Sequence, residues 1–230
     1  MKQQEIVVII PAFNEENAIG KVLADIPSNW VNEVIVVDNN SSDQTAQAAT
    51  DAGATVLQET FQGYGAACLK GIEYCRQRSP RPDIIVFLDA DYSDYPEELP
   101  HLVNPINKDG IDMVIGSRAL GQRERGSMTI PQVFGNWLAT TLLRWIYGAK
   151  FTDLGPFRSI RFPALLDLNM QDKTYGWTVE MQLKAVRNGL RYAEVPVNYR
   201  NRVGKSKISG TVKGTVMAGY KILMTIFQYS

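Results

Sequence analysis

The first half of the chain alternates short apolar runs with segments of helical spacing. The apolar runs are rich in β-branched residues and predict strands at 6–10, 34–37, 55–57, 84–88 and 113–115. The segments between them predict helices at 16–26, 43–52, 64–78 and 96–106. Strand runs without polar alternation, separated by helices, are typical of a parallel sheet that is covered on both faces. The pattern therefore predicts an α/β fold with a mostly parallel sheet flanked by helices.

The second half of the chain is less regular. It predicts a loop rich in Arg and Gly at 116–131, an aromatic-rich helix at 132–147, strands at 157–160 and 192–199 around a helix at 178–188, and a basic loop at 201–209. The chain shows no internal repeat, low-complexity tract or flexible linker, and 230 residues suit one domain. We expect a single domain over residues 1–230.

The C-terminal segment at 210–228 raises the question of a membrane span. As a helix it would extend roughly 28 Å at about 1.5 Å per residue, which is nearly the thickness of a bilayer core. Lys213 and Lys221 interrupt the segment, and each costs about 2.5–3.5 kcal/mol near the midplane. The segment is therefore a poor span and fits an amphipathic helix that lies on the protein or on a membrane surface.

Composition narrows the class of protein. Hydrophobic residues make up 45% and charged residues 21%, which excludes a disordered or fibrous chain. The 24 basic and 24 acidic residues cancel, so we expect no nucleic-acid partner. Cys68 and Cys75 are expected to be reduced core residues. The N-terminal sequence turns acidic too early for a signal peptide, so we expect a cytoplasmic protein.

Polar residues gather directly after the predicted strands, where parallel α/β sheets bind their ligands. The sharpest group is Asp89-Ala90-Asp91, after the apolar run 84–88. Residues two apart on an extended chain project to the same side, so two carboxylates would face one point and repel each other. Mg²⁺ or Mn²⁺ would relieve that repulsion, and such an ion is usually shared with substrate phosphates. The alternative is a pair of solvated acids in a turn.

Two further acids follow predicted strands. Asp38 follows the second strand, and a carboxylate there can accept hydrogen bonds from a nucleobase edge or from ribose hydroxyls. The alternative is a helix-capping turn, with Ser42 as the N-cap, that Ser42 and Asp43 satisfy by themselves. Glu15 either contacts a base or favours a helix N-terminus through the helix dipole. The glycine-rich stretch at 63–67 lacks the features of a dinucleotide loop but suits a flexible approach to a ligand.

Positive charge is concentrated in two loops. The first contains Arg118, Arg123 and Arg125, and the second contains Arg200, Arg202, Lys205 and Lys207. Arginine binds phosphate oxygens bidentately and lysine acts as a point charge, so two such loops suit a substrate with several phosphates. The alternative is ordinary solvated loop charge.

The aromatic residues of the second half have several possible roles. Trp137, Trp145, Tyr175 and Trp177 either stack on a sugar, touch lipid or pack in the core, and packing in the core is the interpretation that we favour for most of them. His101 stands alone in a predicted helix, and we expect it to be structural.

An ordered set of motifs covers most of residues 6–207. The motifs are IIPAFNEE, VVDNNSSDQT, FLDADYSDYPEEL, VIGSR, TDLGPFRSIR, GWTVEMQLKAVRNG, EVPVNYR and RVGKSK. Together they resemble the family-2 inverting glycosyltransferases of GT-A fold, and especially the dolichyl- or polyprenyl-phosphate mannosyl- and glucosyltransferases. The resemblance implies one GT-A domain with a nucleotide-sugar-binding half at 1–118, an acceptor-side half at 119–209 and an amphipathic helix at 210–230.

The resemblance also implies roles for single residues. The base and ribose pocket would be lined by Pro11, Ala12, Phe13, Glu15 and Asp38. The diphosphate would be met, through Mg²⁺ or Mn²⁺ held by the two acids, by Asp89, Ala90 and Asp91. The phosphates of donor or acceptor would be held by Arg118, Arg202 and Lys207. Asp153 would lie on the acceptor side, so that the expected catalytic set is Asp89, Asp91, Arg118 and Asp153.

The chain departs from the family pattern at three positions. Asn39 stands where a second acid often follows Asp38. Ser93 stands where the lipid-phosphate branch often has a glutamine metal ligand, which leaves water or Asp94 to fill that place. Thr178 stands near the position of a frequent basic residue, which leaves one phosphate contact unaccounted for.

The expected reaction transfers a hexose from a UDP- or GDP-hexose to a polyprenyl phosphate. The metal and the arginines would neutralise the departing nucleoside diphosphate. A lipid phosphate is ionised at neutral pH and needs no general base, in agreement with the lack of an obvious His or Cys catalyst. The enzyme would work peripherally on the cytoplasmic face of a membrane or with a membrane-protein partner.

Other functions remain open at this point. The main alternative is a family-2 glycosyltransferase that acts on a hydroxyl of a glycan or small molecule, which would need a base such as Asp153 or Glu180. A nucleotide-sugar-binding module without turnover is disfavoured by the presence of Asp38, Asp89 and Asp91. A sugar-phosphate nucleotidyltransferase is disfavoured because its glycine-rich N-terminal signature is absent.

Overall fold

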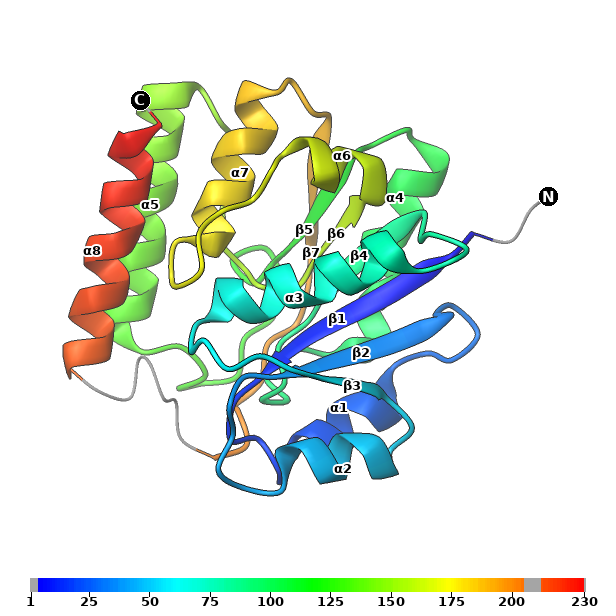
Figure 1. Cartoon of the computed structure of the whole chain (residues 1–230). Coiled ribbons are helices and arrows are strands. Elements are labelled where there is room, and N and C mark those ends of the chain that lie inside the picture. The colour runs from blue at the N-terminus through cyan, green and yellow to red at the C-terminus, as the bar shows by residue number, and fades with distance from the viewer. Residues whose placement is uncertain (1–3, 205–211, 230) are drawn as a thin grey trace.

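The computed structural model describes residues 4–204 and 212–229, and it is built around one twisted sheet (Figure 1). In the described chain the strand order is β3-β2-β1-β4-β6-β5-β7. The strands are β1 (Ile6–Ala12), β2 (Glu33–Asp38), β3 (Thr55–Gln58), β4 (Ile84–Phe87), β5 (Met113–Ser117), β6 (Arg158–Arg161) and β7 (Tyr192–Pro196). Neighbours are parallel except that β6 runs antiparallel to β4 and β5. The predicted mostly parallel α/β sheet is confirmed.

Helices cover both faces of the sheet. One face carries α1 (Ile19–Asp25), α2 (Thr45–Asp51) and α4 (Leu99–Lys108), the last preceded by the 3₁₀ turn η1 (Pro96–Glu98). The other carries α3 (Tyr64–Gln77), α5 (Ile130–Tyr147), α6 (Phe162–Asp167), α7 (Trp177–Arg187) and α8 (Val212–Gln228). Successive β1 residues point to opposite faces, so Val8 packs with the first set and Val7 with the second. This two-sided burial explains why the strands read as unbroken apolar runs.

Several local predictions differ from the structure. Helix α6 was not predicted, and the helix predicted at 96–106 divides into η1 and α4. The prediction of Ser42 as an N-cap is wrong, because α2 begins at Thr45 and the Asp43 carboxylate accepts the Thr45 N–H. The backbone N–H of Ser42 instead donates to the Asn14 side chain across the loops. Acidic side chains in this turn satisfy the amides that a serine cap would have taken.

The pair α5 and α8 lies along one side of the molecule, with the two helices side by side (Figure 1). In the described chain no helix is long and apolar enough to cross a membrane. Core packing is the correct interpretation for Trp177, which is 1% exposed, and the wrong one for Trp137 and Trp145, which are 58% and 79% exposed. The latter two lie on the outer surface of α5, where sequence spacing alone does not distinguish a buried from an exposed aromatic stripe. The two cysteines are buried and unpaired, as predicted.

Candidate active site

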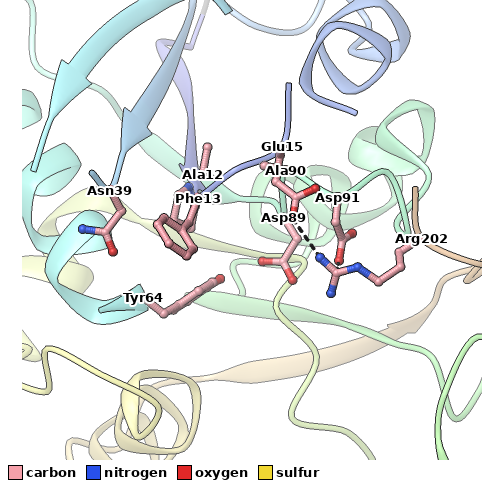
Figure 2. Close-up of a pocket in the computed structure, with 10 residues that line it drawn as sticks. Ala12, Phe13, Glu15, Asn39, Tyr64, Asp89, Ala90, Asp91 and Arg202 are labelled. Carbon is pink, nitrogen blue, oxygen red and sulfur yellow. Dashed lines mark hydrogen bonds and ion pairs between the residues drawn. The ribbon is translucent and has the colours of Figure 1, made fainter. Parts of the chain in front are cut away.

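A pocket lies beyond the carboxyl ends of β1, β2 and β4, where the sequence pattern places the ligand site. It is lined by Pro11, Ala12, Phe13, Glu15, Asn39, Tyr64, Asp89, Ala90, Asp91 and Arg202 (Figure 2). All of these except Asn39 and Tyr64 belong to the set that the sequence predicts for donor binding. The fold therefore brings segments together that are far apart in the chain, because parallel strands end at the same edge of the sheet.

The two acids of the Asp-Ala-Asp motif lie close enough for their charges to interact. Burial and the nearby charge of Asp91 raise the pKa of Asp89 to about 7. In the described chain Asp89 Oδ1 is buried and has no hydrogen-bond partner. Asp91 is 7% exposed, and its Oδ1 accepts hydrogen bonds from the Ser93 amide and hydroxyl. The pair is therefore placed to gain from a nearby cation.

Ser93 stands where related enzymes often have a glutamine metal ligand, and Asp94 follows it in the same loop. The Ser93 hydroxyl is directed at Asp91, so it supports that carboxylate from within the loop. Asp94 is 1% exposed, and neither of its carboxylate oxygens has a hydrogen-bond partner in the described chain. Burial and the charge of Asp89 raise the pKa of Asp94 well above its ordinary value. Asp94 does not line the pocket, and its place as a replacement metal ligand stays a prediction.

Arg202 closes the pocket on the side of the two acids. Its guanidinium pairs with Glu15 Oε1 at 2.8 Å and with Asp91 Oδ2 at 3.1 Å. The segment that carries it follows β7 and is anchored by the Val203 N–H, which donates to the Asp91 carbonyl at 2.9 Å. Lys207, the other predicted phosphate ligand of this loop, lies outside the described residues.

Asn39 is a pocket residue that the donor-binding prediction did not include. Its side-chain NH₂ donates to the Glu59 carbonyl at 3.1 Å and to the Phe61 carbonyl at 2.7 Å, and its Oδ1 accepts from the Gly63 N–H at 2.7 Å. An amide can make all three bonds, whereas a carboxylate cannot donate. Asn39 thus fixes the loop between β3 and α3. Its neighbour Asp38 is buried beside the pocket without lining it.

Tyr64 begins α3 and lines the pocket together with Phe13, below which its ring lies in the view of Figure 2. Burial and the nearby charge of Asp89 raise the pKa of the Tyr64 hydroxyl well above its ordinary value. The glycines on either side pack against another backbone segment, because a Cβ on Gly65 would lie 1.9 Å from the Asp172 carbonyl oxygen. The expected flexible approach of this stretch to a ligand is therefore corrected: the glycines allow a close contact within the protein.

On the other side of the sheet edge, Asp153 and Arg118 form a buried pair. The Asp153 carboxylate accepts from Arg118 Nε and Nη2 and from the Arg118 backbone N–H, all at 2.8 Å. Burial raises the pKa of Asp153, but the charge and hydrogen bonds of Arg118 outweigh it and hold the pKa below its ordinary value. Asp153 is 1% exposed and remains ionised at neutral pH. It is therefore a poor candidate for a general base.

The loop that carries Asp153 is held from three elements. Asn136 of α5 bonds to the backbone on both sides of Asp153, and Gln182 of α7 donates to the Asp153 carbonyl. Glu194 of β7 accepts the backbone N–H groups of Thr152 and Asp153. The loop that carries Asp153 is thus fixed to α5, a helix with exposed apolar residues.

The carboxylate of Glu180, the other candidate base, is engaged in contacts that hold the fold together. It is 1% exposed and accepts from the backbone N–H groups of Gln171 and Asp172, from the Tyr229 hydroxyl and from Lys184. These contacts tie α7 to the preceding loop and to the end of α8. Glu180 does not line the pocket.

The sequence of this chain is similar to those of known proteins, and the similarity shows its family. Residues 7–168 match the model of the family described as "Glycosyl transferase family 2". A dolichyl-phosphate hexose transferase of Haloferax volcanii is 33% identical, with 93% of this chain and 90% of the relative covered. An undecaprenyl-phosphate mannosyltransferase of Micrococcus luteus is 31% identical, with 91% and 89% covered.

The fold is also found in a solved structure. Glucosyl-3-phosphoglycerate synthase of Mycobacterium tuberculosis, crystallised with Mn²⁺, UDP and glucosyl-3-phosphoglycerate, matches with a TM-score of 0.77 at 22% identity. The match covers 98% of this chain and 80% of that chain, and at this identity it shows the GT-A fold alone. By sequence family, fold and the position of its pocket, the chain belongs to the family-2 glycosyltransferases and is an enzyme of that class.

Proposed function

We propose that this protein transfers a hexose from a UDP- or GDP-hexose to a polyprenyl phosphate in a reaction that depends on Mg²⁺ or Mn²⁺. The observation that carries the proposal is the engagement of Asp153 by three hydrogen bonds from Arg118, which makes this carboxylate unsuited to act as a general base. The two relatives named for dolichyl phosphate and undecaprenyl phosphate support the acceptor class.

The donor would bind in the pocket at the sheet edge. Residues 1–118 would form its nucleotide-sugar half, with the base and ribose against Pro11, Ala12, Phe13 and Glu15, and with Ala90 beside the diphosphate. Asp38 does not line the pocket, and its contact with the base or ribose stays a prediction. Residues 119–209 would form the acceptor-side half. Because Arg202 reaches into the pocket from the second half, the diphosphate would be held from both halves at once.

Asp89 and Asp91 fit a divalent cation. Carboxylate oxygens are the hard ligands that Mg²⁺ and Mn²⁺ prefer, and Asp89 Oδ1 is buried with no hydrogen-bond partner in the described chain. Among the described residues no group of three or more His, Cys, Asp or Glu could hold a metal ion, so phosphate oxygens of the donor would complete the coordination. A bound ion would supply positive charge that stabilises the negative charge of the departing nucleoside diphosphate. The Mn²⁺ and UDP in the structurally similar synthase support this assignment.

The acceptor side favours a phosphate over a hydroxyl. A hydroxyl acceptor must lose a proton, and neither candidate base is suited to take it. The pKa of Asp153 is lowered by Arg118, and Glu180 is buried in structural bonds. A phosphate is already ionised, so the site needs only to position it and to neutralise charge. Asp153 would fix the Arg118 guanidinium, and Arg118 and Arg202 would bind phosphate oxygens. Lys207 stays a prediction for the same role.

The surface of α5 and α8 supports a membrane-bound acceptor. Its exposed apolar residues, which we call the α5–α8 apolar face, are Ile130, Val133, Phe134, Trp137, Trp145, Ile146, Val216, Met217, Tyr220, Met224 and Phe227. Neither helix contains an acidic residue, and Trp and Tyr favour the membrane interface. We therefore propose that this face lies on an anionic membrane surface, on the cytoplasmic side. Because Asn136 joins α5 to the acceptor-side loop, the membrane would lie close to the reaction site.

Transfer assays with a panel of substrates test the proposed reaction. UDP- and GDP-hexoses are incubated with Mg²⁺ or Mn²⁺ and with a short-chain polyprenyl phosphate, 3-phosphoglycerate or a glycan hydroxyl as acceptor. We expect metal-dependent transfer to the lipid phosphate and abolition of that transfer in Asp91→Asn. Transfer to a hydroxyl acceptor in place of the lipid phosphate would refute the acceptor class and favour the alternative function.

Vesicle sedimentation tests the membrane surface separately. Trp137→Ser with Trp145→Ser should lower binding to anionic phospholipid vesicles several-fold, whereas Phe61→Ser, an exposed aromatic residue outside both helices, should not. Equal vesicle binding by the wild type and the double variant would contradict the proposed surface.

A further inference from the structure

Arg202 places a positive charge where the donor site concentrates negative charge. Its Nη2 lies 2.8 Å from Glu15 Oε1 and its Nη1 lies 3.1 Å from Asp91 Oδ2, and Figure 2 shows the side chain reaching toward both acids. The two carboxylate side chains are 8% and 10% exposed, so water screens these pairs weakly. In this arrangement Arg202 relieves the repulsion among Glu15, Asp89 and Asp91.

Both oxygens of Asp91 are already engaged. Oδ1 accepts from the Ser93 amide and hydroxyl, and Oδ2 pairs with Arg202. A divalent cation between Asp89 and Asp91 would need an oxygen of Asp91 on its pocket side. It would therefore compete with the guanidinium, because two cations close to one carboxylate repel each other.

The backbone lets Arg202 change partners without leaving the site. The N–H of the next residue, Val203, donates to the Asp91 carbonyl at 2.9 Å, so a change of side-chain partner would not require the backbone to detach. In the described chain Arg202 Nε is buried and has no hydrogen-bond partner. A diphosphate beside Asp91 would offer acceptor oxygens to this donor and to the two terminal nitrogens, in the bidentate geometry that arginine prefers.

We propose that Arg202 stands in for the divalent cation before the donor binds, and that its transfer from carboxylates to phosphates couples metal binding to nucleotide binding. This inference rests on the proposed metal and donor site. A metal ion alone would have to displace Arg202 from Asp91 with no new partner for the guanidinium. A metal ion that arrives with a nucleoside diphosphate brings that partner. Because such coupling is reciprocal, each ligand raises the affinity for the other, and the metal enters together with the nucleotide.

Mn²⁺ titrations test the coupling without any turnover. Free Mn²⁺ is measured by its electron paramagnetic resonance signal for wild type, Arg202→Gln and Arg202→Lys, each with and without UDP or GDP. For wild type we expect the nucleotide to tighten Mn²⁺ binding at least tenfold. For Arg202→Gln we expect Mn²⁺ alone to bind at least threefold more tightly than to wild type. We also expect the nucleotide to tighten Mn²⁺ binding by a factor at least threefold smaller than in wild type, because direct contact of the metal with the phosphates remains.

Arg76→Gln, as an additional control, and Arg202→Lys make the result specific. Arg76→Gln removes the same charge from an exposed i,i+3 pair on α3 and should match wild type in every titration. Arg202→Lys keeps the charge but cannot bridge both carboxylates, so its Mn²⁺ affinity should fall between wild type and Arg202→Gln. It also keeps the test usable should the glutamine variant not fold.

The outcomes separate this inference from the proposed function. The proposed role of Arg202 is overturned if Arg202→Gln or Arg202→Lys binds Mn²⁺ alone no more tightly than wild type does, and if the nucleotide tightens Mn²⁺ binding to the variant as much as to wild type. Wild-type protein that binds neither Mn²⁺ nor nucleotide overturns the proposed donor site itself, and the inference falls with it.

Discussion

The amide of Asn39 gives a sharp test of how the donor pocket is shaped. Asn39→Asp keeps the size of the side chain and one acceptor oxygen but replaces the NH₂ group, which bonds to the carbonyls of Glu59 and Phe61. Two carbonyl oxygens would then face a carboxylate at a position that is 6% exposed. The bond from the Gly63 N–H at 2.7 Å would survive, so the change isolates the donor role.

The expected cost follows from the lost bonds. Each buried hydrogen bond contributes about 1 kcal/mol net, and a carbonyl left without a donor costs about 1–3 kcal/mol. Relaxation of the loop and entry of water recover part of this, so we expect Asn39→Asp to lower the free energy of unfolding by roughly 3 kcal/mol at about pH 7.5. Protonation of the new carboxyl restores one donor, so the loss should shrink as the pH falls.

Urea denaturation of wild type, Asn39→Asp and Asn40→Asp at about pH 7.5 and about pH 5 measures these differences. Asn40 is the matched control, because it is exposed and its φ of 64° is one that Asp also tolerates. We expect the control to stay within about 0.5 kcal/mol of wild type. An Asn39→Asp protein as stable as this control would refute the role assigned to the amide.

Three other changes follow from the same structure. Asp153→Asn should cost about 3 kcal/mol by urea denaturation, because it breaks the buried pair with Arg118; a loss below about 1 kcal/mol would contradict the tight coupling of the two side chains. The pKa of Asp89 is raised to about 7 in the folded protein, above the value of about 4 in an unfolded chain. Between these pH values the folded state binds more protons than the unfolded state, so the metal-free protein should lose stability as the pH rises from about 4 to about 7. Asp89→Asn should therefore raise the Tm at about pH 8 while it abolishes Mn²⁺ binding, and a lowered Tm would show that the charge is better compensated than the structure indicates. Gly65→Ala should cost at least about 2 kcal/mol because its Cβ meets a backbone carbonyl, whereas Gly135→Ala in α5, with open space around it, should stabilise by up to about 1 kcal/mol; equal denaturation midpoints for the two would contradict this packing.

Much of the fold follows from local patterns. Unbroken apolar runs such as Ile84–Phe87 predict buried parallel strands, and polar residues directly after them predict a site at one sheet edge. The place of β6 between β4 and β5 could not be predicted, because strand order depends on contacts between residues far apart in the chain. The exposure of Trp137 and Trp145 likewise depends on what covers α5.

In the candidate site, too, some residues could be predicted from the sequence and some contacts could not. Asp89 and Asp91 could be predicted as site residues from the sequence, because they are two positions apart and directly follow a predicted strand. The charge of the loop after β7 indicates phosphate binding, but the contact of Arg202 with Glu15 joins residues that are 187 positions apart and needed the fold. Asn39 had a signal in its place next to Asp38, whereas its role depends on a loop more than twenty residues away.

The most direct test of the proposed function compares two acceptors that differ by one phosphate. A short-chain polyprenyl phosphate and the polyprenol with the same chain are each incubated with the enzyme, the preferred nucleotide-hexose and Mn²⁺, and the products are identified by mass spectrometry. We expect a hexosyl phosphate-linked lipid from the first acceptor and no glycosylated lipid from the second. Glycosylated polyprenol, or lipid products that form equally well without the phosphate, would contradict the proposed function.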